Sequence, residues 1–118
     1  MLGRIVMQVY KCEKSDRENA EKYIFKDGEK ELGYGYFMQT EINPIDIFIH
    51  EEFRSNGYGK ELFLQMIKVA KDHGLKAMMF QIGIENYRII NIIASFGALN
   101  IGTSNGIQKW VLPIDFKR

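Results

Sequence analysis

The sequence predicts an α+β protein whose elements follow the order β-β-β-β-α-β-α-β-β. Before residue 54 the chain consists of short β-prone runs separated by turn residues, and after residue 59 apolar residues recur at helical spacing. The chain contains no internal repeat or linker, and its 118 residues are a typical length for one folding unit. We therefore expect residues 1–118 to form a single domain.

The first half of the chain should supply four strands. Residues 3–13 alternate between apolar and polar side chains, as a strand with one buried face does. Residues 22–26 and 32–40 flank Asp27-Gly28, and two β-prone runs around an Asp-Gly pair are typical of a hairpin. Residues 45–49 alternate Ile with other side chains, and this β-branched content predicts the fourth strand.

Two helices and three more strands should fill the second half. Apolar side chains three and four residues apart predict a first helix that follows residue 59 and ends at Gly74. A second helix is expected over residues 86–96, and its many Ile side chains predict that it is largely buried. The remaining expected strands are residues 77–82, 99–103 and 107–112, the last two joined by a turn at Asn105-Gly106.

Composition disfavours several functions. The 16 basic and 15 acidic residues are interleaved and give a net charge of +1, unlike the basic excess of most nucleic-acid-binding proteins. The single cysteine excludes an intramolecular disulfide and a cysteine-rich metal site, and we predict no metal site. Arg4 and Gln8 interrupt any signal-like run, and no apolar stretch approaches the roughly 20 residues of a membrane span. We expect a cytoplasmic protein that binds neither nucleic acid nor membrane.

The pattern Arg54-x-x-Gly57-x-Gly59 lies between a predicted strand and a predicted helix. The first N–H groups of a helix have no partner within it, and glycine lets the backbone approach a phosphate closely. The pattern therefore suits an anion-binding loop, although an ordinary strand-to-helix turn explains an isolated match equally well. Lys60 follows Gly59, but the preceding glycines of a P-loop are missing, and the chain is too short for a dinucleotide-binding fold.

Residues 47–62 resemble the cofactor motif of the GNAT acetyltransferase superfamily, in which a hydrophobic strand and a polar turn precede Arg/Gln-x-x-Gly-x-Gly/Ala and a helix. Asn86 followed by Gly97 resembles the second motif of that family. The resemblance extends over about residues 3–112. It implies a mixed, mostly antiparallel and twisted sheet of about seven strands with two main helices.

The resemblance also implies roles for individual residues in binding acetyl-CoA as cosubstrate. The main chain at Ile49 should pair with the pantetheine arm like an added strand, and Phe48 is also expected to bind the cofactor. Asn86 should contact the same arm or the ribose end, with the N-cap of the second helix as its structural alternative. The residues expected to hold the pyrophosphate are Arg54, Ser55, Asn56, Gly57, Tyr58, Gly59 and Lys60.

The chain departs from the family at the positions that carry acid–base chemistry. Ile93 stands where many relatives have a tyrosine as general acid, and Asn43-Pro44 covers the stretch where many have a carboxylate. Asp46 is the nearest acid on the strand and the candidate catalytic residue, with an edge residue or a hydrogen-bond acceptor as alternatives. His50 can also serve as a base, although a lone histidine is more often incidental.

A second departure affects the acceptor side. Relatives usually have two helices between the first two strands, and about residues 14–21 are too few for such a pair. The acceptor side should therefore be open, completed either by a second subunit in a homodimer or by a macromolecular acceptor. Tyr34, Tyr36 and Phe37 are candidates for such a contact, or for the core.

The resulting hypothesis is an acetyl-CoA-dependent N-acetyltransferase. It would transfer an acetyl group to the primary amine of a small molecule or peptide by direct attack in a ternary complex. The alternative from a different class is a non-catalytic acyl-CoA-binding or protein-interaction module on the same fold. A weaker alternative is a structural protein that binds no cofactor.

Overall fold

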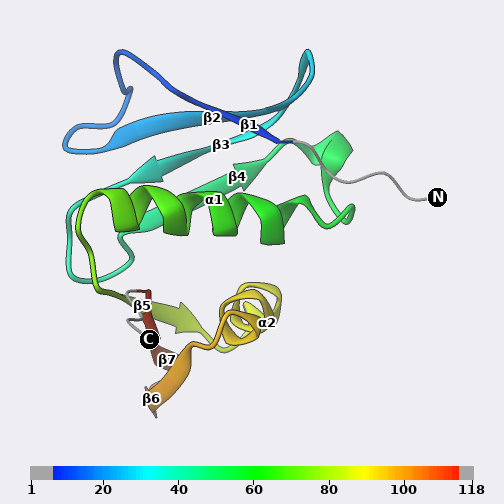
Figure 1. Cartoon of the computed structure of the whole chain (residues 1–118). Coiled ribbons are helices and arrows are strands. Elements are labelled where there is room, and N and C mark those ends of the chain that lie inside the picture. Colours follow the sequence, from blue (N-terminus) through cyan, green and yellow to red (C-terminus); the bar gives the residue numbers. More distant parts are fainter. Residues whose placement is uncertain (1–6, 115–118) are drawn as a thin grey trace. The chain divides into compact units, whose positions relative to one another are not determined.

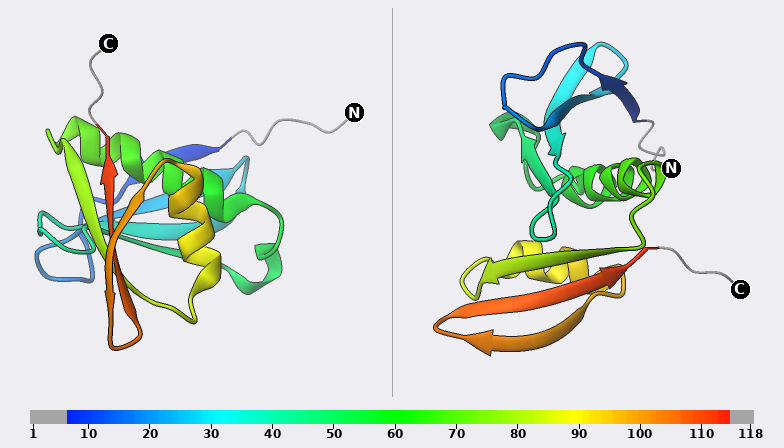
Figure 2. Two further views of the ribbon diagram at one scale, coloured as in Figure 1. Left: turned by 90° about the horizontal axis from the view of Figure 1, so that it is seen from below. Right: turned by 90° about the vertical axis from the view of Figure 1, so that its left-hand side faces the viewer.

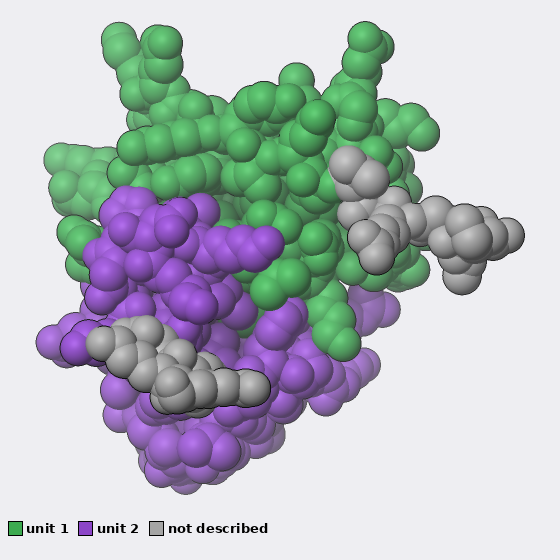
Figure 3. All heavy atoms as spheres, in the orientation of Figure 1, with its two compact units in different colours: residues 1–39, 45–66 green, residues 40–44, 67–118 purple. Residues whose placement is uncertain are grey.

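The computed structural model describes residues 7–114, which divide into two compact units (Figure 3). Unit 1 contains residues 1–39 and 45–66, and unit 2 contains residues 40–44 and 67–118. Within these described residues there are seven antiparallel strands and two α-helices. They follow the predicted order along the chain (Figure 1). The α+β class expected from the sequence is therefore confirmed, with the strands distributed over two sheets.

Unit 1 is built on a four-stranded antiparallel sheet with the order β1-β2-β3-β4. Its strands are β1 (Gln8–Lys11), β2 (Glu21–Asp27), β3 (Lys30–Phe37) and β4 (Ile45–Ile49). The expected strand over residues 3–13 is shorter than predicted at its C-terminal end, and its first residues lie outside the described part of the chain. Residues 12–20 contain no helix, so the helical pair usual in the family is absent between β1 and β2, as predicted.

The inner face of this sheet forms the core of unit 1 with the start of helix α1 (Tyr58–Asp72). The largest buried side chains on this face and the helix are Phe25, Leu32, Phe37, Leu62 and Met66. Gly35 lets the helix approach closely, because a Cβ atom at this position would lie 3.1 Å from the sulfur of Met66. A β-bulge interrupts the β2–β3 pairing after Phe25, opposite the glycine-containing part of β3.

Unit 2 contains a three-stranded antiparallel sheet with the order β5-β7-β6 and helix α2 against one of its faces (Figure 2). The bounds are β5 (Ala77–Gly83), α2 (Tyr87–Ser95), β6 (Leu99–Ser104) and β7 (Ile107–Pro113). The prediction that α2 is largely buried is wrong. Only Ile93 is buried, and Ile89 is 46% exposed, because a helix on one side of a small sheet can bury only one stripe of its surface.

Candidate functional site

Strand β4 is the edge strand of the four-stranded sheet. It pairs with β3 on one side, and no strand of unit 1 pairs with its other side. Ile45 is buried on the inner face, whereas Asp46 and Phe48 are exposed on the opposite face, as alternation along a strand requires. Such an edge presents free main-chain N–H and C=O groups to an extended ligand. Phe48 and Ile49, which are predicted to bind the cofactor, both lie in this strand.

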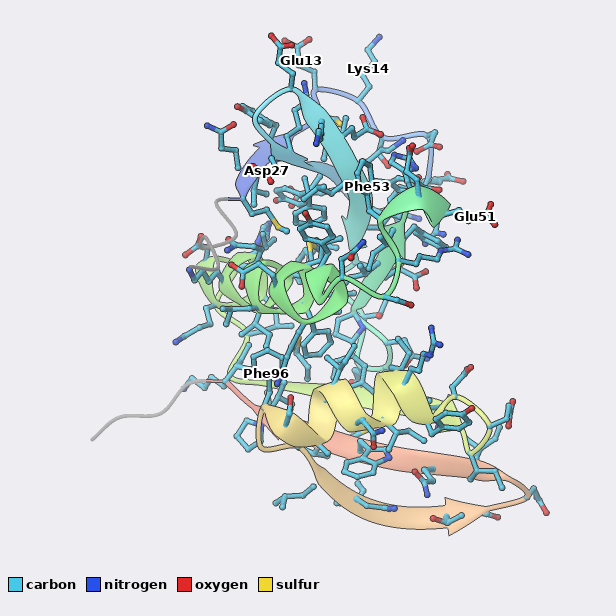
Figure 4. All side chains as sticks on the ribbon, turned by 90° about the vertical axis from the view of Figure 1, so that its right-hand side faces the viewer. Glu13, Lys14, Asp27, Glu51, Phe53 and Phe96 are labelled. Atoms are coloured by element: carbon cyan, nitrogen blue, oxygen red, sulfur yellow. The ribbon has the colours of Figure 1, made fainter. Side chains whose placement is uncertain are left out.

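The turn after β4 is held against the end of the strand. A short 3₁₀ helix, η1 (Glu51–Phe53), directs Glu51 toward solvent, while Phe53 packs edge-on against Tyr58 with their ring centres 6.2 Å apart (Figure 4). Arg54 then folds back, and its Nε donates a hydrogen bond to the carbonyl of Ile49 at 3.1 Å. These contacts fix the position at which the loop enters α1.

The loop that enters α1 carries backbone N–H groups without a hydrogen-bond partner in the described part of the chain. No acceptor within residues 7–114 pairs with the N–H groups of Ser55, Asn56 or Gly57. Ser55 and Gly57 have positive φ values of 69° and 81°, and no atom lies within 4 Å of a Cβ atom built on Gly57. Tyr58, Gly59 and Lys60 form the first turn of the helix. Free N–H groups, open space and the positive end of a helix dipole are the features that an anion-binding site requires.

Asn86 lies in unit 2, at the N-cap position of α2, but its side chain makes no capping hydrogen bond. Its main chain holds the turn instead, because its N–H donates to Gly83 and its carbonyl accepts from Ile90. The side-chain amide of Asn86 is exposed and free among the residues that the structure describes. Asn86 is therefore the N-cap residue of α2 as predicted, but the prediction that its side chain caps the helix is wrong.

Asp46 takes part in an ion pair on the outer face of the four-stranded sheet. Its Oδ2 accepts a hydrogen bond of 2.8 Å from Arg17, which lies in the connection between β1 and β2. This hydrogen bond is the main cause of the raised pKa of Arg17. The structure therefore gives the hydrogen-bond-acceptor alternative a specific partner, Arg17.

The same connection covers Tyr36. The Tyr36 hydroxyl donates a 2.7 Å hydrogen bond to Asp16, and this bond is the main cause of both a raised pKa for Tyr36 and a lowered pKa for Asp16. Tyr36 is only 3% exposed and Phe37 only 2%, so neither is available for an open contact surface. Of the three aromatic residues considered for that role, only Tyr34 is partly exposed.

Sequence reasoning did not identify Asp16 and Arg17 as site residues. They lie in a polar stretch whose composition indicates only an interruption between strands. The alternation that places Tyr36 and Asp46 on one face is visible in the sequence, but the return of the loop over that face is not.

His50 and Asn43 have structural partners. His50 Nε2 lies 2.5 Å from Glu31 Oε2, so the histidine is not isolated. In unit 2, the side chain of Asn43 accepts a hydrogen bond of 3.0 Å from the Gln81 N–H, which ties the segment before β4 to β5. The side-chain amide of Asn43 therefore binds the main chain of β5, in the stretch where many relatives have a carboxylate.

Within residues 7–114, no cluster of three or more His, Cys, Asp or Glu side chains is placed to hold a metal ion. In the same part of the chain, no helix is both long enough and apolar enough to cross a membrane.

The free N–H groups at the start of α1, the free edge of β4 and the element order can be compared with known proteins. The acetyltransferase (GNAT) family model matches residues 7–98. The chain belongs to this family. Comparison with curated protein sequences found no match.

Solved structures share the GNAT fold. An acetyltransferase from Bacillus subtilis in complex with CoA superposes with a TM-score of 0.75 at 14% identity, covering 92% of this chain and 99% of that chain. A spermidine N-acetyltransferase from Vibrio cholerae in complex with CoA and spermine gives a TM-score of 0.67 at 13% identity, covering 80% of this chain and 66% of that chain. The protein yncA from Salmonella typhimurium, with its cofactor acetyl-CoA, gives a TM-score of 0.65 at 17% identity, covering 81% of this chain and 65% of that chain. At these identities the likeness concerns the fold.

Proposed function

We propose that this GNAT protein is an acetyl-CoA-dependent N-acetyltransferase that acetylates a primary amine. The observation that carries the proposal is the set of free N–H groups at Ser55, Asn56 and Gly57, in front of α1 and beside open space at Gly57. A pyrophosphate supplies the negative charge and the acceptor oxygens that such a site lacks. CoA complexes of proteins with the same fold support the choice of acetyl-CoA.

The proposed reaction is a direct transfer between two bound substrates. The lone pair of the neutral amine attacks the thioester carbonyl carbon, a C–N bond forms, and the C–S bond breaks. The amine nitrogen loses one proton, and the CoA thiolate gains one, so the products are an N-acetyl amine and free CoA. Pairing of the pantetheine arm with the edge of β4 at Ile49, whose carbonyl also accepts from Arg54, would hold the thioester carbonyl beside that strand.

Several assignments remain predictions. The contact of Asn86 with the cofactor rests on the resemblance, and its free side-chain amide is compatible with that role. Action of the whole chain as one acetyltransferase domain, the cytoplasmic location and the homodimer also remain predictions. For the homodimer, size-exclusion chromatography with light scattering gives a direct test.

Replacement of Gly57 with Glu tests the anion site. The added carboxylate would face the phosphates and should weaken acetyl-CoA binding by about a hundredfold or more, since juxtaposed like charges cost several kcal/mol. Gly28→Glu is the matched control, because Gly28 also has a positive φ, of 64°, and open space around its Cβ position. Calorimetric titration with acetyl-CoA measures both variants. Equal affinity in the wild type and Gly57→Glu would refute the site.

The non-catalytic acyl-CoA-binding module is the second candidate. Ile93, at the position where many relatives have the tyrosine acid, is fully buried and cannot donate a proton. Release of free CoA thiol in the presence of amines separates the two candidates. Tight acetyl-CoA binding without thiol release across monoamines, diamines and peptides would favour the module.

A further inference from the structure

Three aromatic rings form a continuous surface on the outer face of the four-stranded sheet. Tyr34 and Phe48, on paired strands, stack with ring centres 5.1 Å apart and planes inclined by 22°. Tyr36 lies edge-on to both, at 5.9 Å from Tyr34 and 6.3 Å from Phe48. The carboxylates of Asp16 and Asp46 border these rings. We call Tyr34, Tyr36, Phe48, Asp16 and Asp46 the outer-face site.

Arg17 occupies one part of the outer-face site. Its guanidinium carbon lies 4.0 Å from the ring centre of Tyr36 and 5.6 Å from that of Phe48, while its Nη1 is 2.8 Å from Asp46. A planar cation stacked on an aromatic ring and paired with a carboxylate has the contacts by which proteins recognise a guanidinium ligand. The position of Arg17 therefore indicates that this surface can bind a guanidinium group.

Lys22 occupies the adjacent part. Its ammonium lies 4.8 Å from the ring centre of Tyr34 and 5.8 Å from that of Tyr36, and 3.6 Å from Asp16. Two cations thus rest on neighbouring rings, each with its own carboxylate. The surface is suited to organic cations rather than to anions or neutral aliphatic groups.

Arg17 is the more replaceable of the two cations. It lies on the helix-free connection between β1 and β2, whereas Lys22 belongs to β2 itself. The side chains of Arg17 and Asp46 are 38% and 49% exposed, and an ion pair with this exposure is only weakly stabilising. Displacement of Arg17 would uncover the ring of Tyr36, which is 3% exposed beneath it.

We propose that the outer-face site binds a cationic group of the acceptor in the place that Arg17 occupies, and that the acceptor is a small dibasic amine. One charged end would rest on Tyr36 and Phe48 and pair with Asp46, while the other end, as a neutral primary amine, reaches the thioester. Asp46 and Phe48 belong to β4, the strand proposed to hold the pantetheine arm, so the anchor and the reacting bond share one element. The location of the reacting end rests on the proposed function.

In this proposal Asp46 is the charge partner of the acceptor rather than its base. Asp46→Asn keeps the shape of the side chain and removes its charge. It should therefore raise the KM for a dibasic acceptor and leave kcat within a few-fold of wild type, because the loss concerns binding. A fall in kcat with an unchanged KM would instead assign proton transfer to Asp46 and overturn the charge-partner role.

The binding test uses agmatine, which carries a guanidinium and a primary amine, and is performed on the full chain without acetyl-CoA. Pentylamine, a monoamine of similar length, is the comparison ligand. Arg17→Ala should tighten agmatine binding by about three- to tenfold, because a site occupied by its own side chain is available only in the fraction of molecules where that side chain has left. Asp46→Asn and Phe48→Leu should weaken it, and circular dichroism checks that both variants are folded.

Lys14→Ala is the matched control for charge. Lys14 lies three residues before Arg17 on the same connection, is exposed, and projects away from the sheet (Figure 4). Its removal changes the net charge equally without freeing the site, so agmatine affinity should change by less than about twofold. Equal effects of Arg17→Ala and Lys14→Ala, or equal binding of agmatine and pentylamine, would overturn the proposal.

The two proposals fail in different ways. If acetyl-CoA does not bind while Arg17→Ala still tightens agmatine binding, the proposed function is wrong and the cation site is correct. If acetyl-CoA is consumed equally with monoamines and dibasic amines and agmatine affinity does not respond to Arg17→Ala, the cation site is wrong and the enzyme function is correct.

Discussion

The inner and outer faces of the four-stranded sheet are built by alternate residues of the same strands, yet they differ in chemistry. The inner face carries buried apolar side chains and two glycines, and α1 packs closely against it. The outer face carries aromatic rings paired with two cations and two carboxylates, covered by a loop rather than a helix. The difference indicates that the inner face supplies stability and the outer face supplies recognition. Substitutions on the two faces should therefore have effects of different size and kind.

The largest effect is expected from Gly33→Ala on the inner face. A Cβ atom at Gly33 would overlap the carbonyl oxygen of Phe48, so β3 and β4 would have to separate. We expect the free energy of unfolding to fall by more than about 4 kcal/mol, enough to prevent folding in a small protein. Gly102→Ala is the control, because nothing lies within 4 Å of its Cβ position, and it should change stability by less than about 0.5 kcal/mol. Urea unfolding followed by circular dichroism measures both, and a stable Gly33→Ala variant would contradict the close approach.

Leu62→Ala should have the next largest effect. Leu62 is fully buried in α1, and its truncation leaves a cavity that should lower the free energy of unfolding by about 3 kcal/mol. Leu99→Ala provides the matched comparison, because Leu99 is 62% exposed and little apolar surface returns to water. The same unfolding measurement applies. Similar losses in the two variants would mean that Leu62 is not part of a packed core.

Much of this inner face could be predicted from the sequence. The bounds of β4 agree with the prediction for residues 45–49, and the helical spacing from Leu62 to Ala70 falls within α1. The turn at Asn105-Gly106 also joins β6 to β7 as expected, with positive φ at both residues. These features could be predicted because side-chain period and turn chemistry are local properties of the chain.

The outer face could be predicted only in part. Alternation places Asp46 opposite the inner isoleucines, but its partner Arg17 is 29 residues away in sequence, on a connection with no periodic pattern. The exposure of α2 was missed for a related reason. The apolar side chains of a helix show which residues can be buried. How many of them are buried depends on the area of the neighbouring elements that the helix packs against.

Tyr36→Phe should remove a pH-dependent contribution from the outer face. The hydrogen bond from Tyr36 lowers the pKa of Asp16 below its ordinary 3.8, so the associated stability is present above that pH and is lost as pH falls through the lower folded value. The bond to Asp16 also raises the pKa of Tyr36 above its ordinary 10.0, so that stability is present below pH 10.0 and is lost as pH rises through the higher folded value.

The difference in unfolding free energy between wild type and Tyr36→Phe should therefore form a plateau between about pH 5 and 9 and shrink on both sides. Urea unfolding across the pH range measures it. Tyr34→Phe is the control, because the hydroxyl of Tyr34 makes no hydrogen bond within residues 7–114 and its removal breaks no bond to a carboxylate. A pH-independent difference for Tyr36→Phe would show that the hydroxyl does not bond to Asp16.

The smallest effect concerns the ion pair between Arg17 and Asp46. A double-mutant cycle with Arg17→Ala and Asp46→Ala isolates their interaction, which should contribute about 0.5 kcal/mol because both side chains are partly exposed and screened by solvent. This low value is what allows an acceptor cation to displace Arg17, since the competing contact then costs less than a tenfold change in affinity, or about 1.4 kcal/mol. A measured coupling above about 2 kcal/mol would mean that Arg17 is fixed on the outer face as part of the structure. The recognition assigned to that face would then have to be abandoned in favour of a stabilising role like that of the inner face.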